Sequence, residues 1–170
     1  MNHCCRPSDS SDVKPGTFYN HNRGERIMDV HIRWMIRKDM PEVIAIDEDC
    51  FWNPWDEKEW LAIARERATI THIAEYCDQV IGVMVVTLFK TKIELVKIMV
   101  KPGFQRQLVG DLLIAKLRGK MNPTRNRSIT VVPDDNLGAH LFLRAMGFKA
   151  TGIEDDFYLF ELTKKGRVTA

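Results

Sequence analysis

The chain has 170 residues, of which 45% are hydrophobic and 28% are charged, and its formal net charge is +2 at pH 7. This length suits one domain and is too short for two, and the near-neutral charge gives no support to nucleic-acid binding. No apolar run is long enough to span a membrane, and the four cysteines lack the spacing of a zinc site, so we expect no membrane contact, no metal and a reducing, cytoplasmic setting.

The first 27 residues are the least patterned part of the chain. They are rich in Ser, Asp, Asn, Pro, Gly and Arg and show neither strand nor helix periodicity. Such a segment buries too little apolar surface to offset the entropy of ordering it. We therefore expect a disordered tail over 1–27 and a single domain over 28–165. A protein that starts at Met28 is an alternative that the sequence leaves open.

From Asp29 onward the pattern predicts a strand and then two helices. Apolar and polar residues alternate over 29–35, as in a strand with one buried face. Asp39 is placed to cap a first helix, which ends at the break Asn53-Pro54. Asp56 and Glu59 have the spacing of a capping box, which predicts the start of a second helix.

The rest of the chain alternates between strands and helices. Periodicity and turn residues predict strands over 69–76, 80–89, 92–100 and 128–132, helices over 108–117 and from Asp134 or Asp135 to a stop at Gly147, and a closing hairpin over 148–153 and 157–162. This order predicts an α/β domain with a mixed, mostly antiparallel sheet of about seven strands flanked by four helices.

The segment 100–113 (VKPGFQRQLVGDLL) runs from a buried strand through a polar loop into a helix. The first amides of a helix have no intrahelical partner, and the helix dipole adds positive character there. Such a loop can hold a pyrophosphate without many lysines, and Arg106 or Lys101 would add to the attraction. Many helices that follow a strand bind nothing, so this pattern alone is weak.

The same segment resembles the motif V-x-P-x-x-Q/R-x-x-G-x-G/A of the GCN5-related N-acetyltransferase (GNAT) superfamily. The matching residues are Val100, Pro102, Gln105 and Gly110. Downstream of this motif, at the expected distance, a group of residues resembles the second signature of that superfamily: Asn136, Ala139, Phe142, Gly147 and Phe148. The segment 51–60 is similar to the aromatic-Pro-Trp segment of the ribosomal-protein-alanine acetyltransferase branch.

The resemblance implies the GNAT fold and the transfer of an acetyl group from acetyl-CoA to a primary amine, either a small molecule or a protein or peptide such as a protein N-terminus. Acetyl-CoA would lie in a splay between the fourth and fifth strands. The residues that the resemblance assigns to cofactor binding are Ile98, Met99, Val100, Arg106, Gln107, Leu108, Val109, Gly110, Asp111 and Asn136. The oligomeric state is not predicted.

Three positions depart from the motifs. Leu108 stands where the first motif glycine is usual, Leu143 where many members have a tyrosine that protonates CoA, and Val131 where the alanine-acetyltransferase branch has a glutamate base. Asp111 adds a negative charge beside the expected diphosphate, or simply points to solvent. These departures favour an alternative, a non-catalytic GNAT-fold module that binds acyl-CoA or a partner protein.

Glu94 is the candidate for the general base. It stands six residues before Val100, where the histone-acetyltransferase branch is similar in placing a glutamate. Its apolar neighbours would partly desolvate it, which suits a base. The equally weighted alternative is an ion pair with Lys92 or Lys97, or a solvent-facing strand end.

Three groups are candidates for the proton donor to the CoA thiolate: water, His140 and Tyr158. For His140, a position on the helix surface is the more common case.

An aromatic cluster marks the expected junction of the first two helices. Trp52, Trp55 and Trp60 would line an acceptor groove or belong to the core, and the core is favoured for Trp60. The neighbouring acidic run 47–49 would attract a cationic acceptor or, more commonly, form a solvated helix end.

Overall fold

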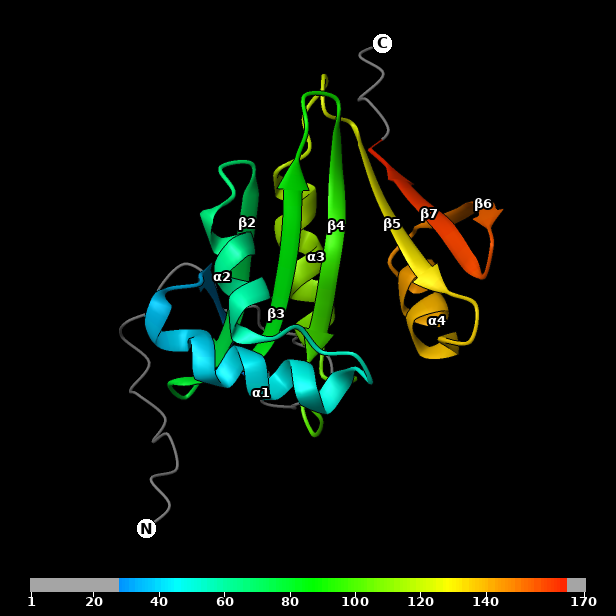
Figure 1. Cartoon of the computed structure of the whole chain (residues 1–170). Coiled ribbons are helices and arrows are strands. Elements are labelled where there is room, and N and C mark those ends of the chain that lie inside the picture. The colour runs from blue at the N-terminus through cyan, green and yellow to red at the C-terminus, as the bar shows by residue number, and fades with distance from the viewer. Residues whose placement is uncertain (1–27, 165–170) are drawn as a thin grey trace, which may run out of the picture.

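The strands form one sheet in the order β1-β2-β3-β4-β5-β7-β6, in which only β4 and β5 are parallel neighbours (Figure 1). The computed structural model describes residues 28–164, so the expected tail over 1–27 and residue 165 lie outside the described residues. The strands are β1 (His31–Trp34), β2 (Thr69–Tyr76), β3 (Gln79–Leu88), β4 (Lys92–Val100), β5 (Arg127–Pro133), β6 (Lys149–Glu154) and β7 (Phe157–Thr163).

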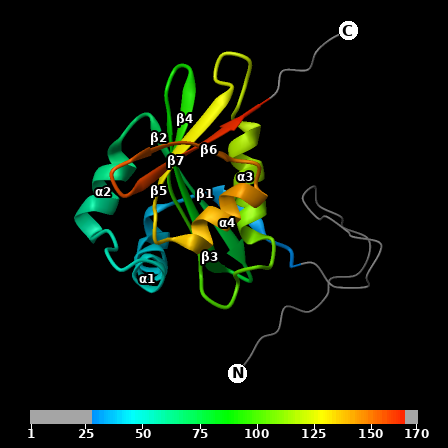
Figure 2. The ribbon, with the colours of Figure 1, turned by 90° about the vertical axis from the view of Figure 1, so that its right-hand side faces the viewer.

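Helices cover both faces of the sheet. They are a 3-10 turn η1 (Arg37–Asp39) and the α-helices α1 (Met40–Cys50), α2 (Glu57–Arg65), α3 (Val109–Gly119) and α4 (Leu137–Ala145). The helices α1 and α2 lie on one face and α3 and α4 on the other (Figures 1 and 2). The predicted fold class, a mostly antiparallel sheet of seven strands with four helices, is confirmed.

Two apolar cores hold these layers together. One lies between the sheet and the α3–α4 layer and contains Leu113, Leu117 and Phe160, and the other contains Val43 and Trp60 beneath α1 and α2. Strand β3, inside the sheet, contributes to both cores because its successive side chains point to opposite faces and almost all are buried. Each fully buried aliphatic or aromatic side chain contributes on the order of 2 kcal/mol to stability.

Several local predictions are confirmed in detail. Asp56 accepts a hydrogen bond from the Glu59 amide at 2.8 Å, and Glu59 accepts one from the Asp56 amide at 2.8 Å, which completes the capping box. The turn between β2 and β3 consists of Cys77 and Asp78, whose φ angles are 49° and 60°, so β3 begins at Gln79, one residue earlier than predicted. Gly147 ends α4 with a φ of 85°.

The start of α1 differs from the prediction. Asp39 precedes the helix, but its side chain does not cap it. Its carboxylate instead accepts two hydrogen bonds from Arg33 at 2.8 Å, and one from the Ile36 amide at 2.8 Å. The partly exposed Arg33 guanidinium therefore outcompetes the helix amides for this buried carboxylate, and the pKa of Asp39 lies below its usual value mainly for that reason. The helix also ends at Cys50, before the predicted break at Asn53-Pro54.

The start of α4 also differs. Its cap is Asn136, whose Oδ1 accepts from the Ala139 amide at 3.1 Å, and neither Asp134 nor Asp135 caps it. The reason is a turn before the helix, in which the Asn136 amide donates to Pro133 O at 3.2 Å. That turn places the third polar residue of the run, rather than the first or second, at the helix start.

Candidate functional site

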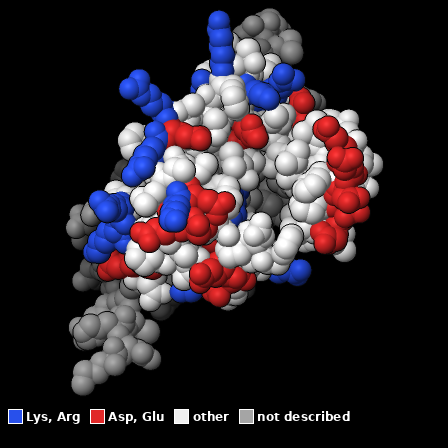
Figure 3. Space-filling model, in the orientation of Figure 1, with Lys and Arg blue, Asp and Glu red and all other residues white. Residues whose placement is uncertain are grey.

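The ladder between β4 and β5 stops after three residue pairs. These pairs are Lys92 with Arg127, Ile93 with Ser128 and Glu94 with Ile129. Beyond them the two strands diverge, with β4 still paired to β3 and β5 to β7 (Figure 1). Alternate main-chain groups of 95–100 and of 130–133 therefore face the opening without a partner strand. The surface is hollowed on this side, between the α1–α2 layer and the β6–β7 hairpin (Figure 3).

The loop at the end of β4 is built from left-handed residues and side-chain tethers. Gly103, Arg106 and Leu108 have φ angles of 92°, 59° and 66°. The side-chain amide of Gln105 donates to Val100 O at 3.0 Å, and that of Gln107 donates to Gly103 O at 2.8 Å. These bonds fold the loop back on itself and direct it into α3.

The first amides of α3 are open to a ligand. The first bond of the helix runs from the Leu112 amide to Leu108 O at 3.0 Å, so the amides of Val109, Gly110 and Asp111 precede the intrahelical ladder. Three adjacent N–H groups with the positive end of a helix dipole form an anion-binding arrangement. Asp111 is only partly exposed, and Arg106 is exposed beside it.

Leu108 adopts the backbone conformation of the glycine that is usual at its position. Its φ is 66° and its ψ is 3°, and 57% of the residue is exposed. More than half of this residue is therefore in contact with solvent. A left-handed conformation costs a residue with a Cβ about 1 kcal/mol relative to glycine.

We expect Leu108→Gly to raise the free energy of unfolding by about 1 kcal/mol, because glycine adopts this conformation without strain. Urea denaturation measures the change. The matched control is Leu141→Gly, an equally exposed leucine inside α4, which should lose about 1 kcal/mol because glycine is unfavourable within a helix. A loss of stability in both variants would show that Leu108 is not strained.

Gly110 lets α3 approach α4 closely. A Cβ at Gly110 would lie 2.8 Å from Cε2 of Phe142, so no larger residue fits unless that ring moves. Leu143, the next residue on α4, is 2% exposed and belongs to the α3–α4 core. Leu143, at the usual tyrosine position, is thus a core residue. Val131 on β5, at the usual glutamate position, is instead 60% exposed.

Glu94 lies at the last residue pair before the strands diverge. Its neighbours Ile93 and Leu95 are buried in the α3–α4 core, so its partly buried side chain points to the α1–α2 face. The alternative of an ion pair is wrong, because Lys97 binds Asp47 and the Lys92 ammonium lies 5.1 Å from the Phe89 ring. Within residues 28–164, the Glu94 carboxylate has no hydrogen-bond or ion-pair partner.

Lys97 and Asp47 form a buried ion pair that the sequence did not predict. Lys97 Nζ lies 2.6 Å from both carboxylate oxygens, and the two side chains are 8% and 0% exposed. Asp47 also accepts from the Trp55 amide and the Trp60 indole N–H, each at 3.1 Å. Burial lowers the pKa of Lys97, against the opposing effect of Asp47. The expectation of a solvated acidic end holds for Glu48 and Asp49 but is wrong for Asp47.

Aromatic rings enclose this ion pair. The Lys97 ammonium lies 4.7, 4.1 and 5.7 Å from the ring centres of Phe51, Trp55 and Trp60. Trp60 is 1% exposed, which confirms its place in the core, whereas Trp52 is 95% exposed. The segment between α1 and α2 is thereby fixed to β4 close to the opening.

Cys50, the last residue of α1, makes a second contact with β4 near the same position. The Cys50 thiol donates to Val100 O at 3.3 Å, and burial raises its pKa.

His140 is not on the surface, contrary to the expectation. It is 8% exposed, its Nε2 is 2.8 Å from Pro133 O, and its ring packs against Tyr158 and Phe160. The helix turns it inward because it shares the buried face of α4 with Leu143. Its hydrogen bond and its packing leave it no freedom to act on a ligand in the opening.

The structure brings the predicted cofactor residues to one region. Residues 98–100 lie on β4 beside the opening, the loop carries 106–108 from there into the start of α3, and the contact of Gly110 with Phe142 joins α3 to α4, which begins after Asn136. The Met99 side chain is 4% exposed and its main chain faces Val83 of β3, so the main-chain groups that face the opening here are those of Ile98 and Val100. Residues 28–164 contain no cluster of three potential metal ligands, and no helix among them could cross a membrane.

Comparisons with known proteins agree with this geometry. The sequence model of the acetyltransferase (GNAT) family matches residues 31–148. No curated protein matches the chain at a significant level.

Solved structures with low sequence identity share the fold. The ribosomal-protein-S18-alanine N-acetyltransferase from Escherichia coli has a TM-score of 0.69 at 17% identity, over 83% of this chain and 98% of that one. NAA60 from Arabidopsis thaliana, in complex with a bisubstrate analogue, has a TM-score of 0.70 at 13% identity, over 81% and 99%. PaiA N-acetyltransferase from Thermoplasma acidophilum, in complex with coenzyme A, has a TM-score of 0.63 at 16% identity, over 79% and 98%.

Proposed function

Because the chain belongs to the acetyltransferase (GNAT) family, we propose that it is an enzyme that transfers an acetyl group from acetyl-CoA to a primary amine. The observation that carries the proposal is the divergence of β4 and β5 beside the open amides of α3. Both the unpaired strand edges and the helix start offer main-chain donors and acceptors in one place. The CoA complex of the similar PaiA supports the same ligand class.

The donor groups fit acetyl-CoA. We assign the pantetheine amides to the segment Ile98, Met99 and Val100, where the Ile98 main chain faces the opening and the Val100 carbonyl already accepts from Gln105 and Cys50. We assign the diphosphate to the amides of 106–111 with Asn136 beside them. Arg106 adds positive charge, while Asp111 partly opposes it.

The chemistry needs an unprotonated amine close to an activated acyl group. Acetyl-CoA would supply the acetyl group as a thioester: the amine nitrogen bonds to the acetyl carbon, the C–S bond breaks, and CoA leaves as a thiolate that takes up the proton which the amine nitrogen loses. Glu94 accepts the proton of the incoming ammonium, because its carboxylate is partly buried, has no internal partner and faces the side from which α1 and α2 border the opening. The chain's own residues thus hold the two substrates and remove one proton.

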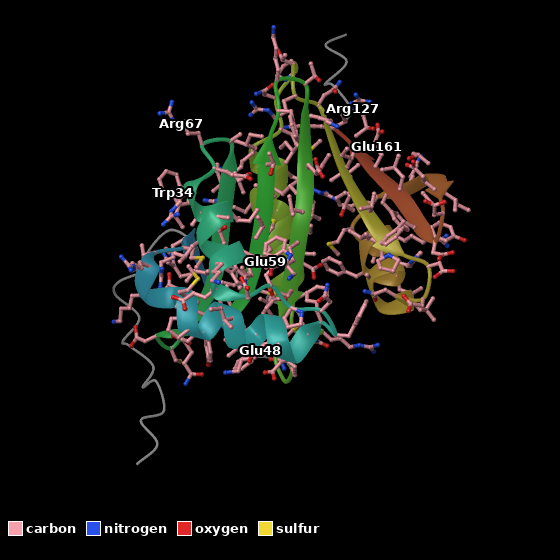
Figure 4. All side chains as sticks on the ribbon, in the orientation of Figure 1. Trp34, Glu48, Glu59, Arg67, Arg127 and Glu161 are labelled. Atoms are coloured by element: carbon pink, nitrogen blue, oxygen red, sulfur yellow. The ribbon has the colours of Figure 1, made fainter. Side chains whose placement is uncertain are left out.

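The acceptor is a protein or peptide N-terminus in our proposal. Three observations support it: Trp52 is exposed, Glu48 and Asp49 are exposed acidic residues on α1 (Glu48 is labelled in Figure 4), and the S18-alanine enzyme and NAA60 are similar in fold. Opposite charge draws an ammonium toward this side of the molecule. The cytoplasmic location stays a prediction.

We expect Glu94→Gln to lower kcat roughly 100-fold, which is the typical contribution of a positioned base. Binding of acetyl-CoA, measured by calorimetry, should not change, because the amide keeps the shape of the carboxylate and lies away from the diphosphate site. The pH dependence of kcat/KM should also differ between Glu94→Gln and the parent protein. Steady-state rates with a panel of peptides and amines between pH 6 and pH 9 measure both effects.

Glu161→Gln is the matched control. Glu161 lies on β7, paired with Ile129, which is itself paired with Glu94, so the two glutamates share one row of the sheet and one face. Two strand spacings, roughly 10 Å, separate their backbones. Loss of turnover in the control alone would move the role of base to Glu161. Full turnover of Glu94→Gln at every pH would remove Glu94 from the mechanism.

A non-catalytic module that binds acyl-CoA is the second candidate. The observation that favours it is that Leu143 is buried and Val131 is aliphatic, so neither position supplies an acid or a base. Saturable acetyl-CoA binding without turnover on any acceptor of the panel would support this candidate. Absence of any thermal shift with acetyl-CoA would contradict both candidates, since binding to the folded state must stabilise it.

A further inference from the structure

A groove lies on the sheet beyond the opening, over the strands β5, β7 and β6. It has a volume of about 420 Å³. We call it the hairpin groove and define it by five of the residues that line it: Val131, Gly152, Glu154, Phe157 and Leu159. The residues assigned above to acetyl-CoA and to proton removal are not among those that line it.

The floor of the hairpin groove is the face of the sheet that points away from α3 and α4. Val132 and Phe160 are buried in the α3–α4 core, so Val131 and Leu159, which precede them, point to the opposite face. Glu94 points to that same face from β4. The groove and the proposed base therefore share one side of the sheet.

The pairing of the strands arranges the groove residues in two rows. Val131 pairs with Leu159, and Leu159 pairs with Gly152, which forms the row nearer the opening. Phe157 pairs with Glu154 in the next row, beside the hairpin turn. Because the rows cross β5, β7 and β6 in order, the groove leads from the opening toward the outer edge of the sheet.

The floor is apolar and uncovered. Val131 is 60% exposed and Phe157 is 46% exposed, and Leu159 between them is partly buried. The helices α1 and α2 lie in front of β2 to β4 and leave β5, β7 and β6 uncovered on that side (Figure 1). Large apolar side chains that gather in a concave surface generally mark a binding site.

Gly152 keeps the floor open at the outer end of its row. A Cβ at this position would meet only the Cβ of Leu159, at 4.0 Å, which is an ordinary contact, and the backbone is not left-handed there. The fold would accept a side chain at this position, and the absence of one leaves space beside Leu159.

Carboxylates border the groove at the hairpin turn. Glu154 and Asp155 both line it, and no lysine or arginine is among the described residues that do. Neither carboxylate forms an ion pair within residues 28–164. This end of the groove therefore attracts a cationic side chain and repels an anionic one.

The groove lies within reach of a peptide whose amine is at Glu94. Ile129 is paired with Glu94, and Val131 follows two residues later on β5. One strand spacing and two residues of rise separate the backbones of Glu94 and Val131 by roughly 8 Å. Two to three residues of an extended chain, at about 3.4 Å each, cover that distance.

On the basis of the acetyl transfer proposed above, we propose that the hairpin groove binds the acceptor through an apolar side chain at its second or third residue and a basic side chain further along. Successive side chains of an extended chain alternate in direction, so one of these two residues faces Val131 and Leu159. The chain then continues toward Glu154. A small amine gains nothing from this groove, so the groove favours peptide acceptors.

The test compares three hexapeptide amides that share an N-terminal alanine and contain no lysine: Ala-Leu-Leu-Gly-Arg-Gly, Ala-Ser-Ser-Gly-Arg-Gly and Ala-Leu-Leu-Gly-Glu-Gly. Steady-state release of the CoA thiol by the full chain measures their acetylation. We expect kcat/KM of the first peptide to exceed that of the serine peptide at least tenfold, mainly through KM, because a leucine side chain leaves water. It should exceed that of the glutamate peptide roughly fivefold.

Gly152→Leu fills the groove without a clash. It should raise KM for the first peptide about tenfold and leave both KM for the serine peptide and the urea denaturation midpoint unchanged. Gly119→Leu is the matched control, because Gly119 is an exposed glycine at the end of α3 with no atom within 4 Å of an added Cβ. It should leave the preference among the peptides unaltered.

Glu154→Lys should reverse the preference between the arginine and glutamate peptides. Faster turnover of the glutamate peptide than in the parent protein cannot result from misfolding, so this gain is informative by itself. An unchanged preference would contradict the role of the carboxylates at the hairpin turn.

The remaining outcomes separate this inference from the proposed function. Turnover of the leucine and serine peptides with equal kcat/KM, or a leucine preference that survives Gly152→Leu, would overturn the assignment of the groove and leave acetyl transfer standing. Absence of turnover with every peptide and small amine would contradict acetyl transfer itself. Self-association of the chain that light scattering detects and Gly152→Leu abolishes would make a second copy the occupant of the groove.

Discussion

Acidification from pH 7 to pH 4 is expected to cost the fold about 3 kcal/mol through His72 alone. His72 on β2 is fully buried, and neither of its ring nitrogens has a hydrogen-bond partner among the residues that the structure describes. Burial, and then the nearby Lys120 and Lys116 of the α3 region, lower its pKa from 6.5 to about 4. The unfolded chain therefore binds a proton near pH 6.5 that the folded chain resists until about pH 4. Stability from this residue is complete above pH 6.5 and is lost as the pH falls through that window.

The variant His72→Leu isolates this effect. It should be more stable than the parent at pH 7 by about 1 kcal/mol, because two unsatisfied buried nitrogens are removed. Urea denaturation at pH 7, 5.5 and 4.5 should show a smaller loss of stability for the variant. His31→Leu, on the exposed side of β1, should follow the parent. An unchanged pH dependence in His72→Leu would assign the acid sensitivity to other groups.

The second large effect is expected from Asp47→Ala, which should lower the free energy of unfolding by about 3 to 5 kcal/mol. The substitution leaves the Lys97 ammonium buried without its counter-ion and removes the acceptor of the Trp60 indole N–H. It should also loosen the segment between α1 and α2, which forms one side of the opening. Urea denaturation measures the stability, and the KM for a peptide acceptor measures the change at the opening.

Two comparisons define this result. Asp49→Ala, two residues along α1 and exposed, should cost less than about 0.5 kcal/mol. Asp47→Leu combined with Lys97→Met should be less harmful than Asp47→Ala, because an apolar pair leaves no uncompensated charge. Equal effects of Asp47→Ala and Asp49→Ala would show that the buried pair contributes little.

The elements that depend on local pattern were predictable from the sequence. The bounds of β2 and β4 are as expected, since each is a run of strand-forming residues between clear turns. The capping box at Asp56 and the helix stop at Gly147 follow from short-range chemistry. The family resemblance, rather than periodicity, supplied the expectation that β4 and β5 diverge.

The features that depend on packing were not predictable. Asp47 and Lys97 are 50 residues apart in the chain, and nothing in either neighbourhood distinguishes a buried pair from two surface charges. His140 was expected on the surface because a single histidine on a helix does not reveal which face is buried. Periodicity also does not show that Leu108 adopts a left-handed backbone, or that the outer strands leave a groove beside Val131.

The divergence of β4 and β5 has a consequence for solubility. Unpaired strand edges usually sit at the rim of a sheet, where a strand from another molecule can add and start aggregation. Here two unpaired stretches, beyond Glu94 and beyond Ile129, face each other in the middle of the sheet, between two layers of helices. A small ligand can reach hydrogen-bonding groups there, whereas a foreign strand would have to part the two halves of the protein first.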